Sequence, residues 1–159
     1  MGPLLFLCYI YDIYRSTELA TFLFADDTTC LAEHKNLDTL INKVNTELQK
    51  LATWFKANKM AVNVKKTQYI IFRTRGKKID LSDMDVVFNS NDLNTTNPDP
   101  NLVYKLDRVH DNNNDENMRS FKLLGVYFDE YLSFNKHISM LAAKLSRANF
   151  LLRRVTNFV

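Results

Sequence analysis

The most constraining feature of this sequence is a run of apolar residues, spaced three or four positions apart, between Leu37 and Phe55. This spacing predicts an amphipathic α-helix, with Asn36 available as its N-cap and an end near Asn58. A similar pattern between Ile138 and Val155 predicts a second helix. An amphipathic helix must bury its apolar face against another layer of structure. The chain therefore needs further elements that pack against these helices.

Short β-prone runs supply those elements. Residues 21–24 and 28–31 flank Ala25-Asp26-Asp27, which predicts a hairpin with two carboxylates at its tip. The apolar segment 2–14 begins with Gly-Pro, and Pro3 suits the first turn of a helix. We expect an α+β fold: one small antiparallel sheet with helices on one face. Its further strands are expected at 61–64, 68–72, 86–88 and 121–128.

The charges are unevenly distributed along the chain. Its 159 residues carry 21 basic and 18 acidic side chains, a net charge of +3. Residues 48–79 contain nine basic side chains and no acidic one, and residues 131–159 contain five more, again without an acid. This segregation indicates a polyanionic partner, although two solvated basic helix faces would give the same pattern.

Other features of the composition exclude several classes. The longest apolar run has eight residues, 4–11, against the roughly 20 that a membrane-spanning helix needs, so we expect no membrane span. Cys8 and Cys30 define neither a disulfide framework nor a zinc pattern, which favours reduced thiols inside the cell. The three histidines show no metal-ligand spacing.

Asp26 and Asp27 are the residues with the clearest chemical meaning. Adjacent carboxylates at a tight turn repel each other unless water or cations surround them. Carboxylate oxygens are preferred ligands of Mg²⁺, and paired metal ions stabilise the attacking and leaving oxygens in phosphoryl transfer. The dipeptide alone is far more typical of an ordinary turn exposed to water, so the surrounding sequence must support a metal site.

Four sequence blocks occur in a characteristic order. They are Gly2-Pro3-Leu4-Leu5-Phe6; Phe24-Ala25-Asp26-Asp27-Thr28; Trp54 with Asn58-Lys59-Met60 and Asn63-Val64-Lys65-Lys66-Thr67; and Phe121-Lys122-Leu123-Leu124-Gly125-Val126, followed by His137-Ile138. In composition, order and spacing they resemble the reverse transcriptases of non-LTR (LINE-like) retrotransposons.

The resemblance implies a polymerase palm followed by the start of a helical thumb. It assigns residues 1–88 to a partial palm, 118–130 to a primer-grip-like hairpin and 131–159 to the start of the thumb helix. Residues 89–117, rich in asparagine, have no counterpart and are interpreted as an insertion. The implied activity is that of an RNA-directed DNA polymerase, which transfers nucleotidyl groups from dNTPs to a primer 3′ hydroxyl by two-metal catalysis. The implied partners are an RNA template and a DNA primer.

The resemblance also assigns roles to individual residues. Asp26 and Asp27 would be the metal-binding and catalytic carboxylates, with Mg²⁺ as cofactor and Mn²⁺ as an alternative. Lys66 would act on the departing pyrophosphate as a general acid or electrostatic stabiliser, unless it only contacts phosphate or is solvated. The residues expected to contact nucleic acid are Phe24, Ala25, Lys65, Leu124, Gly125, Lys144, Arg147, Arg153 and Arg154.

One part of the family pattern has no counterpart here. The family also uses an aspartate from an earlier palm strand, and Asp12 falls at the end of the first helix and does not match it. We therefore expect a chain truncated at its N-terminus, with the missing N-terminal half of the polymerase as a partner. We expect the isolated chain to bind Mg²⁺ weakly, to be inactive and to expose apolar surface. A non-catalytic nucleic-acid-binding module and a degenerate retroelement-derived reading frame are the alternatives.

Overall fold

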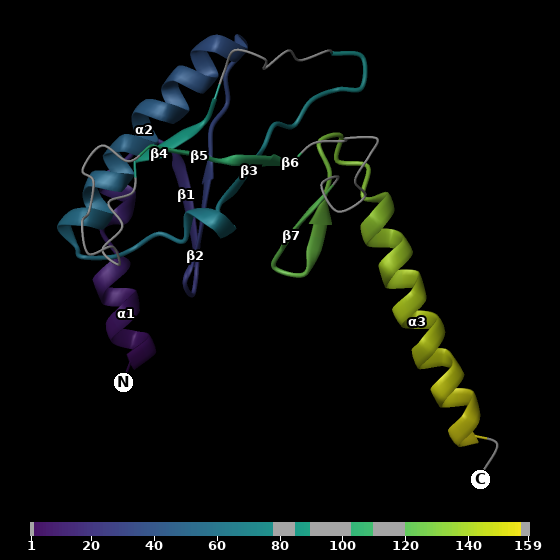
Figure 1. The fold of residues 1–159 in the computed structure, drawn as a ribbon. Helices are drawn as coiled ribbons and strands as arrows, with labels where there is room; N and C mark the ends of the chain where they lie inside the picture. Colours follow the sequence, from purple (N-terminus) through teal and green to yellow (C-terminus); the bar gives the residue numbers. More distant parts are fainter. Residues whose placement is uncertain (1, 78–84, 90–102, 110–119, 157–159) are drawn as a thin grey trace. The chain divides into compact units, whose positions relative to one another are not determined.

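The structure is a computed structural model that describes residues 2–77, 85–89, 103–109 and 120–156. It has mixed helices and strands, as expected of an α+β chain (Figure 1). The chain divides into two compact units. Unit 1 consists of Met1–Gln68 and Asp80–Asp107, and unit 2 consists of Tyr69–Ile79 and Arg108–Val159. Each unit is described by itself.

Unit 1 contains the long helix that the sequence predicted. Helix α2 spans Leu37–Ala57, and the side chain of Asn36 caps it by accepting a hydrogen bond of 3.0 Å from the Thr39 amide. The backbone N–H of Asn58 bonds to the carbonyl of Trp54 at the other end. The predicted bounds and N-cap are confirmed. The preceding segment forms helix α1 (Gly2–Ile10) and the 3₁₀ helix η1 (Ile13–Arg15).

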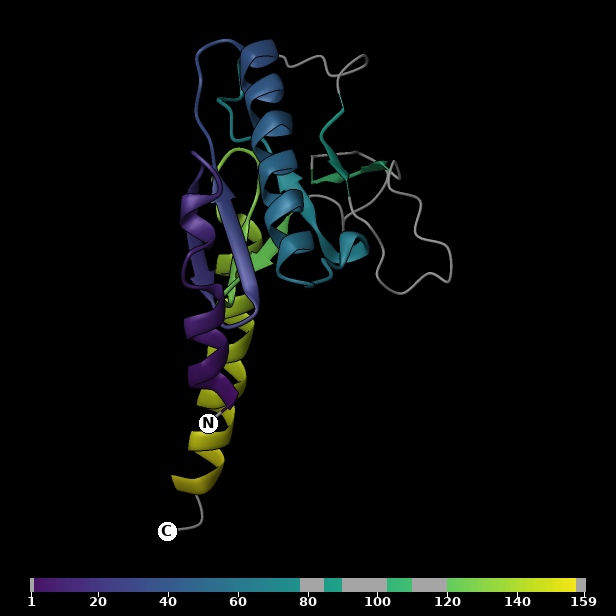
Figure 2. The same cartoon turned by 90° about the vertical axis from the view of Figure 1, so that its left-hand side faces the viewer.

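The core of unit 1 lies between these helices and the first hairpin. Its buried members, Ile10, Ile13, Leu19 and Leu51, come from α1, η1, the segment after η1, and α2. Strands β1 (Ala20–Phe24) and β2 (Asp27–Leu31) pair antiparallel, as predicted, and run alongside α2 (Figure 2). The partly buried residues packed against this core are Phe6, Cys30, Ala32, Leu48, Trp54, Phe55 and Met60.

The other strands are short. They are β3 (Gln68–Ile70), β4 (Val87–Asn89), β5 (Val103–Lys105), β6 (Asp107–Val109), β7 (Phe121–Leu123) and β8 (Val126–Phe128). In the described parts of the chain, β1 pairs with β2, β3 with β6, β4 with β5, and β7 with β8. The expectation of one sheet is therefore wrong for these residues, because they form four two-stranded sheets.

Side chains account for part of this difference. Along β4, the amide of Asn45 on α2 accepts a hydrogen bond from Val87 N–H and donates one to Asp85 carbonyl. A helix side chain thus satisfies backbone groups that a neighbouring strand would otherwise bond. The predicted strand at 61–64 is also wrong: residues 61–63 belong to neither helix nor strand, and Val64–Lys66 forms the 3₁₀ helix η2, where the Asn63 carbonyl accepts hydrogen bonds from Lys66 and Thr67.

Unit 2 contains the β7–β8 hairpin and helix α3 (Asn135–Thr156), both as predicted. Of the proposed insertion, residues 90–102 and 110–117 lie outside the described residues. The described segment 103–105 pairs with β4. None of the helices in the described residues is long and apolar enough to cross a membrane.

Candidate active site and nucleic-acid interface

The β1–β2 hairpin ends in a two-residue turn. Phe24 pairs with Asp27, so Ala25 and Asp26 form the turn and Asp27 is the first residue of β2. Ala25 has φ +52°, in the left-handed region that costs a non-glycine residue about 1 kcal/mol. Such local strain is often found where a backbone must present a functional group. The turn thus places Asp26 at the free end of the hairpin, directly after an alanine with an unfavourable backbone angle.

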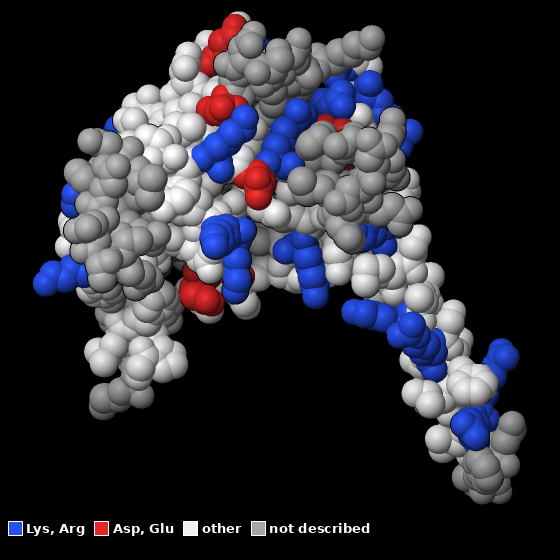
Figure 3. Space-filling view, viewed as in Figure 1, with Lys and Arg blue, Asp and Glu red and all other residues white. Residues whose placement is uncertain are grey.

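Both carboxylates face outward. Asp26 and Asp27 are exposed, and within the described residues neither accepts a hydrogen bond nor forms an ion pair. Figure 3 shows the acidic surface at the tip of the hairpin. Two free carboxylates fit the chemistry of Mg²⁺, which retains waters and takes further oxygens from substrate phosphates. No cluster of three or more potential ligands occurs in the part of the chain that the structure describes, so this ligand set is partial.

A buried glutamate, which the sequence analysis missed, fixes the start of this hairpin. Glu47 on α2 is 3% exposed, and its carboxylate accepts hydrogen bonds from Thr17 Oγ1 (2.8 Å), Glu18 N–H (2.6 Å) and Lys50 Nζ (2.6 Å). Burial alone would raise the pKa of Glu47, but these donors outweigh it and lower the pKa to about 2. The segment immediately before β1 is therefore tied to α2. The available signal was an acidic residue on the apolar face, between Val44 and Leu51.

Cys30 lies within the same hairpin. It pairs across the strands with Thr21 and is partly buried. Burial raises the pKa of the Cys30 thiol, and a hydrogen bond with the Thr21 side chain opposes part of that rise. Cys8, on α1, is exposed.

The structure does not bring Lys66 to the carboxylates. Lys65 and Lys66 are exposed in η2, and no hydrogen bond or ion pair among the described residues joins either lysine to Asp26 or Asp27. In Figure 2 the hairpin lies on one side of the end of α2, and the teal turn of η2 lies on the other. The assignment of Lys66 to the leaving group stays a prediction.

The β7–β8 hairpin carries a different surface. Leu124 (φ +46°) and the exposed Gly125 (φ +91°) form its two-residue turn, where glycine relieves the cost of one left-handed residue. Lys122 and Lys136 place their ammonium groups 6.0 and 5.4 Å from the ring centre of Tyr127. Cationic and aromatic side chains thus lie together where this hairpin meets α3.

A second buried glutamate lies directly after β8. Glu130 is 2% exposed, and Arg73 binds both of its carboxylate oxygens, through Nε at 2.9 Å and Nη2 at 3.0 Å. Arg108 Nη2 lies 3.5 Å from Oε2. Neither the charge pattern nor the sequence blocks predicted this network, because its members are separated by many residues along the chain.

Helix α3 carries the predicted basic residues on an uncovered surface. Lys144, Arg147, Arg153 and Arg154 are all exposed, and Figure 3 shows Lys and Arg side chains following α3. Apolar side chains of the same helix are exposed too. Examples are Ile138 (59%), Leu141 (48%), Leu145 (62%) and Leu152 (64%).

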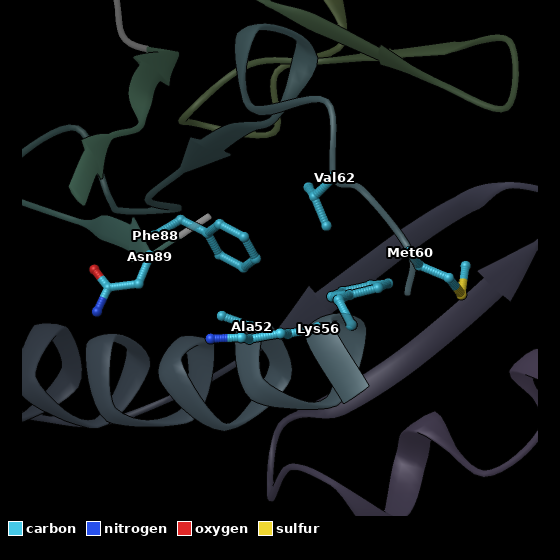
Figure 4. Close-up of a pocket in the computed structure, with 7 residues that line it drawn as sticks. Ala52, Lys56, Met60, Val62, Phe88 and Asn89 are labelled. Atoms are coloured by element: carbon cyan, nitrogen blue, oxygen red, sulfur yellow. The ribbon is translucent and has the colours of Figure 1, made fainter. Parts of the chain in front are cut away.

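One shallow pocket lies in unit 1, and Figure 4 shows it between the end of α2 and β4. It contains none of the predicted site residues and no carboxylate, so it offers no place for the expected metal chemistry. Its lining residues are Ala52, Phe55, Lys56, Met60, Val62, Phe88 and Asn89.

Comparison with protein families identifies the class. The family model described as reverse transcriptase (RNA-dependent DNA polymerase) matches residues 1–128. This match covers most of the chain, which therefore belongs to the reverse transcriptase family. Searches of curated proteins and of solved structures found no match. The match ends at β8, so Glu130 and α3 lie beyond it.

Proposed function

We propose that this chain is the later part of the polymerase core of a non-LTR (LINE-like) retrotransposon reverse transcriptase. It contributes the catalytic hairpin of the palm, the primer-grip hairpin and the start of the thumb. The observation that carries the proposal is the β1–β2 turn, which in a chain of this family presents two exposed carboxylates that have no hydrogen-bond or ion-pair partner among the residues the structure describes.

In this proposal, the carboxylates of Asp26 and Asp27 bind Mg²⁺, with Mn²⁺ as a substitute. The bound metal would supply stabilisation of the attacking and leaving oxygens in nucleotidyl transfer. Phe24 and Ala25 lie beside these carboxylates in the hairpin and would contact the primer end. Lys66 would offset charge on the departing pyrophosphate, and Lys65 would contact a phosphate.

Nucleic-acid binding is assigned to the other hairpin and to α3. Leu124 and Gly125 would hold the primer strand through close backbone approach at the exposed β7–β8 turn. The cations of α3 would track the phosphates of the RNA template and DNA primer without reading their sequence. These cations are Lys144, Arg147, Arg153 and Arg154.

The second candidate function is a nucleic-acid-binding module without catalysis. It is favoured by the exposed basic surface of α3, which carries Lys144, Arg147, Arg153 and Arg154. In that case the basic surfaces matter, and Asp26 and Asp27 do not.

Primer extension separates the two candidates. The 159-residue chain would be assayed alone and joined to an upstream palm segment that carries the family's other catalytic aspartate. We expect no extension by the chain alone, and Mg²⁺-dependent extension by the joined protein. Asp26→Asn should reduce extension by about 100-fold or more, while primer–template binding is retained. Asp12→Asn is the matched control, because Asp12 is exposed and lies at the end of the first helical segment.

Each outcome decides between the candidates. Extension that is lost in Asp26→Asn and kept in Asp12→Asn supports the polymerase. Equal extension by the parent and the Asp26→Asn protein contradicts the catalytic assignment. Binding without extension by the joined parent protein supports the second candidate.

A further inference from the structure

Glu130 joins three separate segments of unit 2. Arg73 follows β3, Arg108 belongs to β6, and Glu130 follows β8. Besides the two side-chain hydrogen bonds from Arg73, the Arg73 N–H donates to the Glu130 carbonyl at 2.9 Å. Arginine binding to a carboxylate through two parallel hydrogen bonds fixes orientation as well as distance. The backbone at residue 130 is thus held from both its carbonyl and its side chain.

The neighbouring residue fixes the path from β8 into α3. The carboxylate of Asp129 accepts hydrogen bonds from the backbone of Tyr131, Ser133 and Phe134, and from the Ser133 hydroxyl. Burial alone would raise the pKa of Asp129, but these donors outweigh it and lower the pKa. Leu132 and Phe134 both adopt left-handed backbone angles within this loop. These hydrogen bonds therefore fix the path of the chain between β8 and α3.

The same network orders an exposed basic turn. Arg73 Nη1 donates to the Lys77 carbonyl at 2.7 Å, and Arg73 Nη2 donates to the Tyr131 hydroxyl at 2.7 Å. The guanidinium groups of Arg73 and Arg75 lie 4.8 and 5.7 Å from the centre of the Tyr131 ring. The guanidinium of Arg73 is thus committed to contacts within the protein, whereas Arg75 and Lys77 are exposed.

We propose that Glu130 is a positioning residue for nucleic-acid binding. By holding Arg73 and Arg108, it fixes the basic turn at 75–77 and the first turn of α3 as one surface for a phosphate backbone. Arg75 then contacts phosphate directly, whereas Arg73 acts through the positions of Tyr131 and Lys77. This inference rests on the proposed function, because it names a residue that shapes the nucleic-acid surface.

The direction in which Glu130→Gln changes the affinity for nucleic acid tests this role. Glu130→Gln removes a negative charge, so long-range electrostatics alone would strengthen binding to nucleic acid. A positioning role predicts weaker binding through the same phosphate contacts, because the basic turn is no longer held beforehand in the arrangement that makes them. The dependence of binding on salt provides a second readout. Each phosphate contact that is lost lowers the slope of log K against log salt by about 0.7 to 0.9.

The experiment measures anisotropy of a labelled DNA primer annealed to an RNA template, at several salt concentrations, with the full 159-residue chain. We expect Glu130→Gln to weaken binding by about three- to tenfold with little change in slope. Arg75→Gln should lower the slope by about 0.7 to 0.9, the value for one lost phosphate contact. Glu33→Gln makes the same chemical change at an exposed position and should bind at least as tightly as the parent. Arg73→Lys keeps the charge but not the paired hydrogen bonds, so it should behave as Glu130→Gln does.

The outcomes distinguish this inference from the proposed function. If the parent protein binds and Glu130→Gln binds equally or more tightly, the inference is wrong and the proposed function stands. If the parent does not bind the primer–template, both fail. If Glu130→Gln does not fold, as judged by circular dichroism, Arg73→Lys decides: weaker binding at an unchanged slope supports the inference, and parental binding overturns it.

Discussion

The two hairpins of this chain have similar turns but opposite surfaces. The β1–β2 hairpin presents carboxylates and is tied to α2 by Glu47 before its first strand. The β7–β8 hairpin is flanked by cations and is held by Glu130 after its second strand. Glu47 joins one helix to one loop through hydroxyl, amide and ammonium donors, whereas Glu130 joins three segments through two arginines. A buried carboxylate can thus secure either a local connection or an arrangement of distant segments.

The largest expected effect on stability comes from removing the Glu47 carboxylate, which ties the segment before β1 to α2. Glu47→Ala removes the acceptor for Thr17 and Glu18, so it should lower the free energy of unfolding of unit 1 by about 2 kcal/mol. Urea unfolding followed by fluorescence of Trp54 measures this, because Trp54 is the single tryptophan and lies in α2. Lys50→Ala is the control and should cost little, because the Lys50 side chain is 47% exposed. Equal losses from both substitutions would contradict the anchoring role of the buried donors.

Acid should weaken the stabilising contacts of the Glu47 carboxylate. The pKa of Glu47 is lowered in the folded chain from the ordinary value of 4.5 to about 2. Stability from this ionised carboxylate is therefore fully present above pH 4.5 and is lost as the pH falls toward 2. Urea midpoints of the parent and of Glu47→Gln, measured across this range, should differ most at the upper end and converge as acid is added. A constant difference would argue against linkage through Glu47.

Exchanging small residues at the two turns should give effects of opposite sign. Gly125 has φ +91° with no atom within 4 Å of an added Cβ, so Gly125→Ala should destabilise its hairpin by about 1 kcal/mol through backbone strain alone. Ala25→Gly should relieve strain at φ +52° and stabilise the β1–β2 hairpin by up to about 1 kcal/mol. Hydrogen exchange of the strand amides measures both effects. A destabilising Ala25→Gly would mean that Ala25 is not strained.

The smallest expected effect on stability comes from the residue with the largest proposed role. Asp26→Asn removes repulsion between neighbouring carboxylates and breaks no contact in the described structure, so the free energy of unfolding should change by less than about 0.5 kcal/mol. Thermal unfolding without divalent ions measures this change. A loss above that range would show that Asp26 has a structural role in the hairpin.

Local pattern predicted much of the fold. Apolar spacing and Asn36 defined α2 and its cap, and the short runs around Ala25 and Gly125 defined both hairpins. These features depend on residues a few positions apart, so they can be read from the sequence. The carboxylates at the first turn were identified in the same way.

The features that were not predicted depend on contacts between residues far apart in the chain. One sheet was expected, but Asn45 satisfies backbone groups beside β4 and Asn63 turns the chain where a strand was predicted. Glu47 and Glu130 were overlooked because a glutamate is ordinarily exposed. Only the folded chain brings them the hydroxyl, amide and guanidinium groups that make their burial stable.

Cys30 can serve as a chemical reporter of the β1–β2 hairpin. Its thiol is partly buried opposite Thr21 with a raised pKa, whereas Cys8 is exposed on α1. A thiol reagent should therefore modify Cys8 at once and reach Cys30 mainly when the strands of the hairpin separate. In a Cys8→Ser protein, the rate of labelling would then report how often the hairpin opens, and bound metal or nucleic acid at its tip should slow it.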